Sequence, residues 1–146
     1  MAIPPTGRIL AVDWGERRIG LAVSDETQTV ASPLATLTRR PGKRFPMPAF
    51  LAHVTELRPV GVVVGLPLDA AGEEGDAARA ARELGGEIGG RTYLPVVYLD
   101  ERMTTARALK AIEEQGGSTR GRKADVDALA ASVLLGHYLD LRRAAR

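Results

Sequence analysis

The segment Val60-Gly-Val-Val-Val64 constrains the fold more than any other part of the chain. Because it is apolar at every position, a strand formed here must be covered on both of its faces. Leu94-Pro-Val-Val-Tyr-Leu99 has the same character and predicts a second strand of this kind. An Ala-, Glu- and Arg-rich segment between the two runs predicts a helix, and strand–helix–strand order is typical of parallel strands in an α/β domain.

The first third of the chain predicts antiparallel pairing instead. Two apolar runs, Arg8–Asp13 and Ile19–Ser24, are separated by a short turn and indicate a hairpin. A third strand is expected over Val30–Leu37. The fold class is therefore α/β, with a mixed five-stranded sheet flanked by helices. We expect its central strands to be residues 8–13, 60–64 and 95–99.

The remaining segments predict helices and loops within one domain of 146 residues. The core is expected over residues 7–139, with residues 1–6 and 140–146 as tails. Basic loops are expected at residues 38–46 and 116–124. The spacing of apolar residues predicts helices at about residues 48–57, 104–115 and 125–142, and the composition predicts one at about residues 73–88.

Composition excludes several classes of protein. The chain has no cysteine, so disulfides, thiol nucleophiles and zinc–thiolate sites are impossible. No apolar run approaches the ~20 residues of a membrane span. The first residues lack a basic-then-apolar signal pattern. We therefore expect a cytoplasmic protein with no membrane partner.

The basic residues favour an anionic polymer as the partner. Of 20 basic residues, 17 are Arg, which binds phosphates with two parallel hydrogen bonds, although a GC-rich genome also favours Arg codons. Segment 38–58 holds five basic residues and one acid, whereas segment 65–90 holds six acids and two Arg. This uneven distribution predicts a surface with one basic side.

Acidic residues stand at the ends of three predicted elements. Asp13 ends a strand, Asp100 and Glu101 follow another, and Asp127 lies in the first turns of the last helix. Turn formation, helix capping and the helix dipole also explain such positions. Together, without Cys or a His cluster, the carboxylates indicate a site for Mg²⁺ or Mn²⁺. Asp100 and Glu101 point to opposite sides of the sheet, so the residues alone leave open which one belongs to the site.

Four motifs, in order, resemble those of the YqgF family, also called RuvX. They are Asp13-Trp-Gly-Glu-Arg-Arg-Ile-Gly-Leu-Ala-Val-Ser-Asp25, Val64-Gly-Leu-Pro67 with Gly72, Asp100-Glu-Arg-Met-Thr-Thr105, and Lys123 with Asp127, Ala130-Ala131, Leu134-Leu135 and Tyr138-Leu139. The resemblance runs from about Gly7 to Leu139. Two departures are mild: Trp14 stands where Phe is usual, and Asp69 where Asn is common.

The resemblance implies an RNase H-like fold related to the RuvC resolvases, and a metal-dependent nuclease. It implies maturation of the 5′ end of pre-16S rRNA in ribosome biogenesis, with Holliday-junction resolution as the alternative. The catalytic, metal-binding residues carried over are Asp13, Glu101 and Asp127, so the resemblance selects Glu101 over Asp100.

Cations near these acids are candidates for binding the substrate's phosphates, and a Thr could donate its hydroxyl. Ordinary solvated charge or helix capping would explain the same residues. The candidate substrate-binding residues are Arg17, Arg18, Arg102, Thr105, Arg120, Arg122 and Lys123.

Two other functions compete with the nuclease. The Asp-x-Gly hairpin also resembles that of actin-like ATPases and sugar kinases, but those need two such domains to enclose a nucleotide. A catalytically silent RNA-binding module is a second alternative, against which the intact set of acids argues. RNA and DNA both remain open as substrates. A resolvase acting on a four-way junction would need to be a homodimer, whereas a processing enzyme would not.

The loop at residues 116–124 gives a prediction about binding. Arg120, Arg122 and Lys123 precede the helix that carries Asp127, so a phosphate backbone passing the acids would meet them. Replacing all three with Ala is expected to weaken nucleic-acid binding and to reduce its salt slope by up to about three. An unchanged salt slope would show that this loop is a solvated connector.

Overall fold

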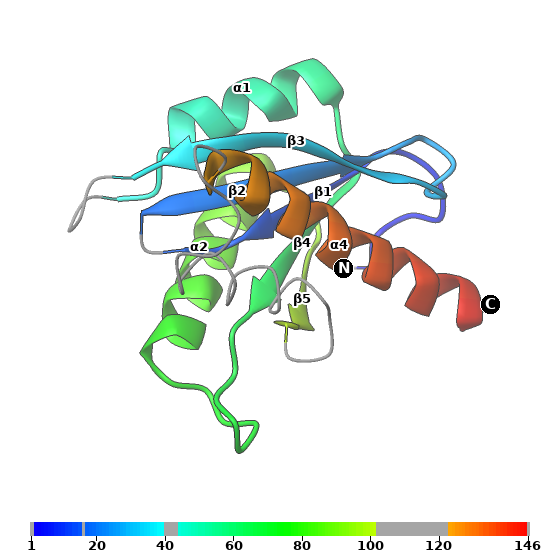
Figure 1. Cartoon of the computed structure of the whole chain (residues 1–146). Helices are drawn as coiled ribbons and strands as arrows, with labels where there is room; N and C mark the ends of the chain where they lie inside the picture. Colours follow the sequence, from blue (N-terminus) through cyan, green and yellow to red (C-terminus); the bar gives the residue numbers. More distant parts are fainter. Residues whose placement is uncertain (1, 16, 40–43, 102–122, 146) are drawn as a thin grey trace.

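The computed structural model describes residues 2–15, 17–39, 44–101 and 123–145 (Figure 1). The helix expected at residues 104–115 and nearly all of the loop at 116–124 lie outside these ranges. The described elements are β1 (Ile9–Asp13), β2 (Arg18–Ser24), β3 (Ala31–Thr38), α1 (Met47–Leu57), β4 (Gly61–Leu66), α2 (Asp76–Thr92), β5 (Val96–Asp100) and α4 (Lys123–Ala144).

The strands form a five-stranded sheet in the order β3-β2-β1-β4-β5. β1 pairs antiparallel with β2, and β2 pairs antiparallel with β3. β4 lies parallel to both β1 and β5. The predicted fold class, a mixed sheet of an antiparallel hairpin unit followed by alternating helices and parallel strands, is confirmed.

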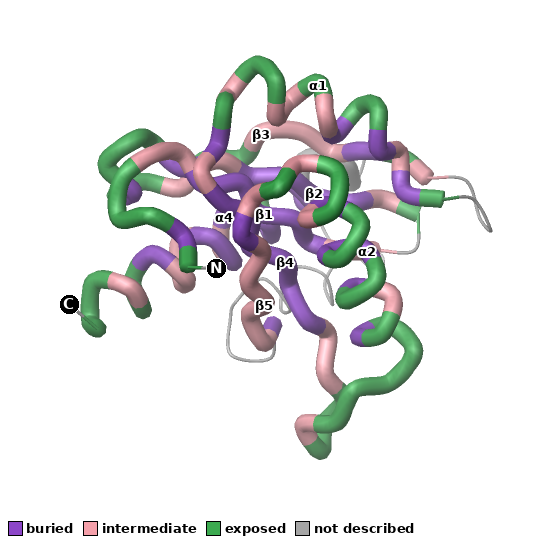
Figure 2. Tube along the Cα trace, turned by 180° about the vertical axis from the view of Figure 1, so that it is seen from behind, coloured by how far each residue is buried: buried purple, intermediate pink, exposed green. Residues whose placement is uncertain are grey.

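The prediction that β5 is a central strand is wrong. In the described part of the chain β5 pairs with β4 alone and stands at the edge of the sheet. All five of its residues are half-buried, whereas β4 is buried throughout (Figure 2). Its apolar run reflects cover on both faces: Tyr98 packs on the side of α2, and Val97 and Leu99 pack on the side of α4. Coverage of the faces and hydrogen bonding at the edges are separate properties, and the sequence pattern reports only the first.

The sheet separates two apolar cores. α4 lies on one face, and α1 and α2 lie on the other (Figure 1). In β1, Leu10 and Val12 belong to the core beneath α1 and α2, whereas Ile9 and Ala11 pack with Ala131, Leu135 and Leu139 of α4. Because strand residues alternate between faces, the next odd position, Asp13, lies on the α4 face.

Two helices differ from their predicted bounds. α2 begins at Asp76 rather than at residue 73 and continues to Thr92, because a buried stripe of Ala78, Ala81, Leu84 and Ile88 holds it against the sheet. α4 begins at Lys123 rather than at residue 125 and continues to Ala144, so Asp125 lies inside the helix. α1 matches its prediction closely, with a Pro in its first turn.

The chain ends pack against each other, although they were predicted to be tails. Ile3 is buried in the core beneath α4. Arg142 near the end of α4 donates hydrogen bonds to the carbonyl oxygens of Ile3 and Pro4. Among the described residues, no helix is both long and apolar enough to span a membrane.

Asp25 organises the turn between β2 and β3. Its Oδ1 accepts hydrogen bonds from the backbone N–H groups of Thr29, at 2.8 Å, and Val30, at 2.9 Å. Its Oδ2 accepts one from the Thr27 hydroxyl. Led by the Thr27 bond, these contacts lower the pKa of Asp25 to about 2. The ionised carboxylate therefore stabilises the conformation of this turn.

Replacing Asp25 with Ala is expected to lower the free energy of unfolding. Because the pKa is depressed in the folded chain, the stabilisation is present above the ordinary value of 3.8 and is lost as the pH falls toward about 2. Urea titrations of both proteins should therefore show a constant difference at neutral pH that shrinks between about pH 4 and pH 2. A difference that does not change over this range would contradict the role of the ionised carboxylate.

Candidate functional site

Asp13 occupies the centre of the candidate site. It is the last residue of β1 and is 1% exposed. In the sheet it pairs with Gly20 of β2, and the neighbouring pair Val12–Val64 places Gly65 of β4 on its other side. Asp13 therefore lies between two glycines, in one row on the α4 face.

Gly20 is where α4 meets the sheet. A Cβ atom built at this position would lie 1.9 Å from the carbonyl oxygen of Asp127, which is far below any real contact distance. Only glycine permits this approach of helix and strand. The contact brings the helix backbone at Asp127 beside the end of β1, and the Asp127 residue is 5% exposed.

Gly65 permits a similarly close approach by the Glu101 side chain. A Cβ atom here would lie 2.4 Å from Oε1 and 3.0 Å from Cδ of Glu101, so this side chain lies directly across β4. Glu101 is 6% exposed, whereas its neighbour Asp100 is only half-buried. The alternation of the two acids agrees with Glu101, not Asp100, as the residue on the α4 face.

Three elements thus carry Asp13, Glu101 and Asp127 to the same end of the sheet. Their carboxylates are not arranged as a finished metal centre, because the described residues include no group of three or more His, Asp or Glu side chains that could hold a metal ion. The prediction that the three converge on one or two divalent ions therefore stays a prediction. The structure shows three buried acids at one end of the sheet. The Glu101 side chain packs against Gly65, and the α4 backbone at Asp127 packs against Gly20.

Arg18 binds the Asp127 carboxylate. Its Nε donates to Oδ2 of Asp127 over 2.6 Å, and the side chains are 31% and 7% exposed respectively. A buried carboxylate needs a cation or hydrogen-bond donors, and Arg18 supplies both. Arg18 was predicted to contact the substrate. In this structure it compensates one of the site's acids, and its side chain is partly exposed.

The other predicted substrate-binding residues are placed only in part. Arg17 is exposed and directly precedes β2. Lys123 begins α4, and its side chain is not described. The candidates outside the described residues are Arg102, Thr105, Arg120 and Arg122.

Sequence reasoning missed two features at this end of the sheet. The first is the pair of close contacts at Gly20 and Gly65. Their only sequence signal is a glycine inside an otherwise apolar strand. The second is the contact of Arg39 with Trp14: its guanidinium lies 4.7 Å from the centre of the indole ring. No sequence signal links these two residues, because Trp14 follows β1 and Arg39 follows β3, which are not neighbours in the sheet.

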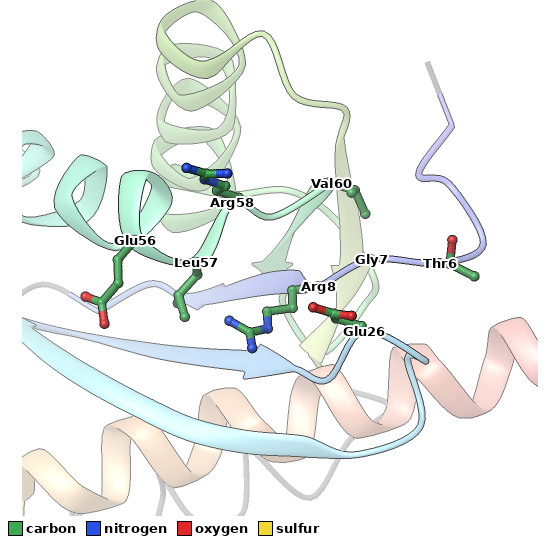
Figure 3. Close-up of a pocket in the computed structure, with 8 residues that line it drawn as sticks. All are labelled: Thr6, Gly7, Arg8, Glu26, Glu56, Leu57, Arg58 and Val60. Atoms are coloured by element: carbon green, nitrogen blue, oxygen red, sulfur yellow. The ribbon is translucent and has the colours of Figure 1, made fainter.

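A separate cavity lies at the opposite end of β1. It has a volume of about 560 Å³ and is lined by Arg8, Arg58, Glu26 and Glu56 together with Thr6, Gly7, Leu57 and Val60 (Figure 3). Thr6, Gly7 and Arg8 of its lining precede β1, whereas Asp13 stands at the other end of that strand. With two basic and two acidic side chains, it lacks the single sign of charge that would select a phosphate or a metal ion.

Comparison with known proteins identifies the family. The family model RuvX, described as Holliday junction resolvase, matches residues 7–141. The chain belongs to the RuvX family. A protein from Roseiflexus sp., named "Putative pre-16S rRNA nuclease", is 35% identical over 137 residues, covering 94% of this chain and 96% of the relative. A protein of the same name from Chloroflexus aurantiacus is 39% identical over 136 residues, covering 92% and 88%.

The fold of this RuvX chain has solved counterparts. The RuvC protein of T. thermophilus, in a complex with a Holliday junction substrate, matches it with a TM-score of 0.58 and 16% identity, covering 94% of this chain and 96% of RuvC. At that identity the likeness shows the fold alone. The predicted family, its nuclease class and the RNase H-like fold that the motifs implied are confirmed.

The pair formed by Arg18 and Asp127 generates a prediction about stability. In buffer containing a chelator, Arg18→Gln is expected to lower the free energy of unfolding by about 1–3 kcal/mol, because it leaves a buried carboxylate uncompensated. Asp127→Asn in the same chain should recover most of this loss. Urea unfolding of the four proteins in the double-mutant cycle measures the coupling directly.

The adjacent Arg17→Gln is the matched control. It removes the same charge from an exposed position and should change the free energy of unfolding by less than about 0.5 kcal/mol. Additive effects of the Arg18 and Asp127 substitutions would show that the pair contributes nothing to stability.

Proposed function

We propose that this RuvX protein is an endonuclease that depends on a divalent cation and cleaves structured nucleic acid, with maturation of the 5′ end of pre-16S rRNA as its reaction. The observation that carries the proposal is the position of buried Asp13 between Gly20 and Gly65. The Asp127 backbone packs against Gly20, and the Glu101 side chain packs against Gly65. Family membership and the names of the curated relatives support the same activity.

The residues present fit Mg²⁺ or Mn²⁺. The donor set is three carboxylates from separate elements, and each of the three residues is less than 10% exposed. Hard divalent cations prefer such oxygen ligands, and buried acids are expensive without positive charge nearby. Asp13, Glu101 and Asp127 would hold the ion. A bound ion of this kind activates water and stabilises the oxygens of a phosphoryl displacement.

The chain's own residues would prepare this reaction in two ways. The tight contacts at Gly20 and Gly65 would hold the elements that carry Asp127 and Glu101 beside Asp13, which lowers the cost of gathering the three carboxylates around an ion. Arg18 adds a partly exposed guanidinium beside Asp127, with donors that suit a phosphate oxygen.

Holliday-junction resolution is the second candidate, because the matching family model carries that description. It makes an additional demand on this chain. Symmetric cleavage of a four-way junction needs two active sites related by a two-fold axis, so this function would require a homodimer. We propose a cytoplasmic location for either activity.

Substitution of the acids tests the proposed function. Asp13→Asn, Glu101→Gln and Asp127→Asn are each expected to lower the rate of cleavage by about 100-fold or more, since direct ligands should cost at least as much as the partners that orient them. The assay offers a pre-16S 5′-end fragment and a four-way DNA junction at equal concentration, with Mg²⁺ or Mn²⁺. Binding of the substrate in the presence of a chelator is measured in parallel.

Glu87→Gln is the matched control, since Glu87 is an exposed acid on α2. It should leave cleavage unchanged. Cleavage that survives all three substitutions in the site would show that the activity belongs to a contaminant or to other residues. Preferential cleavage of the junction by a dimeric protein would favour the second candidate.

A further inference from the structure

Asp127 has a positively charged partner within the chain. Nε of Arg18 donates to Oδ2 of Asp127 over 2.6 Å, and the Asp127 side chain is 7% exposed. The pair joins the first residue of β2 to α4, 109 positions later in the sequence. A hydrogen bond of this length between two ionised groups is a strong one. The fold therefore brings a positive charge to one acid of the proposed cation site.

Burial distinguishes this pair from other ion pairs of the described residues. Three others, each involving an arginine of α2 or α4, have carboxylates that are 37–96% exposed. Such solvated pairs contribute little to stability, whereas a carboxylate shielded from water depends on its partner. The Asp127 carboxylate therefore needs a positive partner, and Arg18 fills that role in this structure.

The arginine, and not the acid, is the member of the pair that can move. The α4 backbone at Asp127 packs against Gly20, and Ala131 and Leu135 of the same helix are buried against the sheet. These contacts hold the helix in place. Arg18 stands two residues before Gly20 on the same face of β2, and its long side chain is 31% exposed. A second cation at Asp127 would therefore displace the guanidinium toward solvent.

We propose that Arg18 and the divalent cation are alternative partners of the Asp127 carboxylate, so that Arg18 lowers the affinity of the site for the ion. This inference rests on the proposed function, in which Asp127 is one of the ligands of the ion. The ion has to break the 2.6 Å hydrogen bond before it gains the carboxylate. A guanidinium and a divalent ion on one carboxylate also repel each other strongly inside a protein.

Such an exchange suits a site built from buried acids. With Arg18 on Asp127, the chain folds at low ion concentration without leaving that carboxylate uncompensated. The apparent affinity of the ion is then reduced, because only the fraction of molecules in which Arg18 has released Asp127 is ready to bind it. Arg18 thus sets the ion concentration at which the site fills, and it is not itself a ligand.

The opposite role for Arg18 makes the opposite prediction. An arginine that kept Oδ2 of Asp127 while the ion took the other oxygen would orient the ligand. Loss of such an orienting partner typically weakens ion binding by about 10–100-fold. The direction of the change in ion affinity on removal of Arg18 therefore decides between the two roles.

Binding of Mn²⁺ in the absence of nucleic acid gives that direction. Free Mn²⁺ is followed by its electron paramagnetic resonance signal in titrations of the wild-type protein and of Arg18→Gln. The variant is expected to bind the ion about 10-fold more tightly, which corresponds to about 1.4 kcal/mol. Arg18→Lys, which keeps the charge but lacks the planar guanidinium, should have an intermediate affinity.

Arg17→Gln is the matched control for the loss of charge. It removes one positive charge from an exposed position one residue earlier in the chain. Its affinity for Mn²⁺ should stay within about twofold of the wild type, because water and salt screen a solvated charge. An equal gain in affinity in Arg17→Gln and Arg18→Gln would show a general effect of charge and would contradict exchange at Asp127.

A second measurement follows Arg18 in the wild-type protein, so it does not depend on the folding of a variant. In nuclear magnetic resonance spectra recorded with a chelator, the Arg18 Nε–H should exchange slowly with water, because it donates to a shielded carboxylate. Saturating Mg²⁺, which is diamagnetic, is expected to make this exchange fast. The exposed Arg17 provides the reference for a solvated guanidinium.

Two results would overturn the inference and leave the proposed function intact. One is unchanged or weaker binding of Mn²⁺ by Arg18→Gln. The other is an Arg18 Nε–H that stays protected at saturating Mg²⁺, which would show that the pair persists beside the ion. Failure of Mn²⁺ to bind to the wild type and to Arg18→Gln alike would instead remove the cation dependence of the proposed function.

Discussion

The architecture of the site depends on two close contacts that only glycine permits. A side chain at Gly20 would collide with the α4 backbone at Asp127, and one at Gly65 would collide with the Glu101 carboxylate. Glycine inside a strand costs about 0.5–1 kcal/mol relative to Ala, and it contributes no packing of its own. This stability is lost at the two positions that flank Asp13 in the sheet. Loss of side-chain volume there is what lets three distant segments meet.

The same end of the sheet also concentrates buried negative charge. Asp13, Glu101 and Asp127 are all less than 10% exposed. Such groups oppose folding unless a cation compensates them, and Arg18 compensates Asp127 from a neighbouring strand. A divalent ion would supply stronger compensation. In the proposed nuclease, local stability at this end of the sheet would be lower in favour of cation binding, as is common for functional sites.

Much of this arrangement could be predicted from sequence, and the failures have definite physical causes. Apolar runs gave the strands and placed Asp13 correctly, because burial on two faces leaves a direct mark on composition. The edge position of β5 is not visible in the pattern of apolar residues, since hydrogen bonding to a neighbouring strand involves only the backbone. The pairs Arg18–Asp127 and Trp14–Arg39 join residues whose proximity is created by the fold, so spacing along the chain carries no trace of them.

Strand alternation explains how so small a domain can offer two different surfaces at one edge. Adjacent residues of a strand face opposite ways, so a run such as Asp13-Trp14 assigns an acid to one face and an aromatic ring to the other without any insertion. Arg18, the first residue of β2, lies on the same face as the acid, where it binds Asp127. Since Asp13 stands where β1 ends and Arg18 where β2 begins, the geometry of one hairpin positions both side chains. A shift of β2 by one residue against β1 would turn Arg18 to the opposite face while Asp13 and Trp14 kept theirs, so the proposed function requires this register as much as folding does.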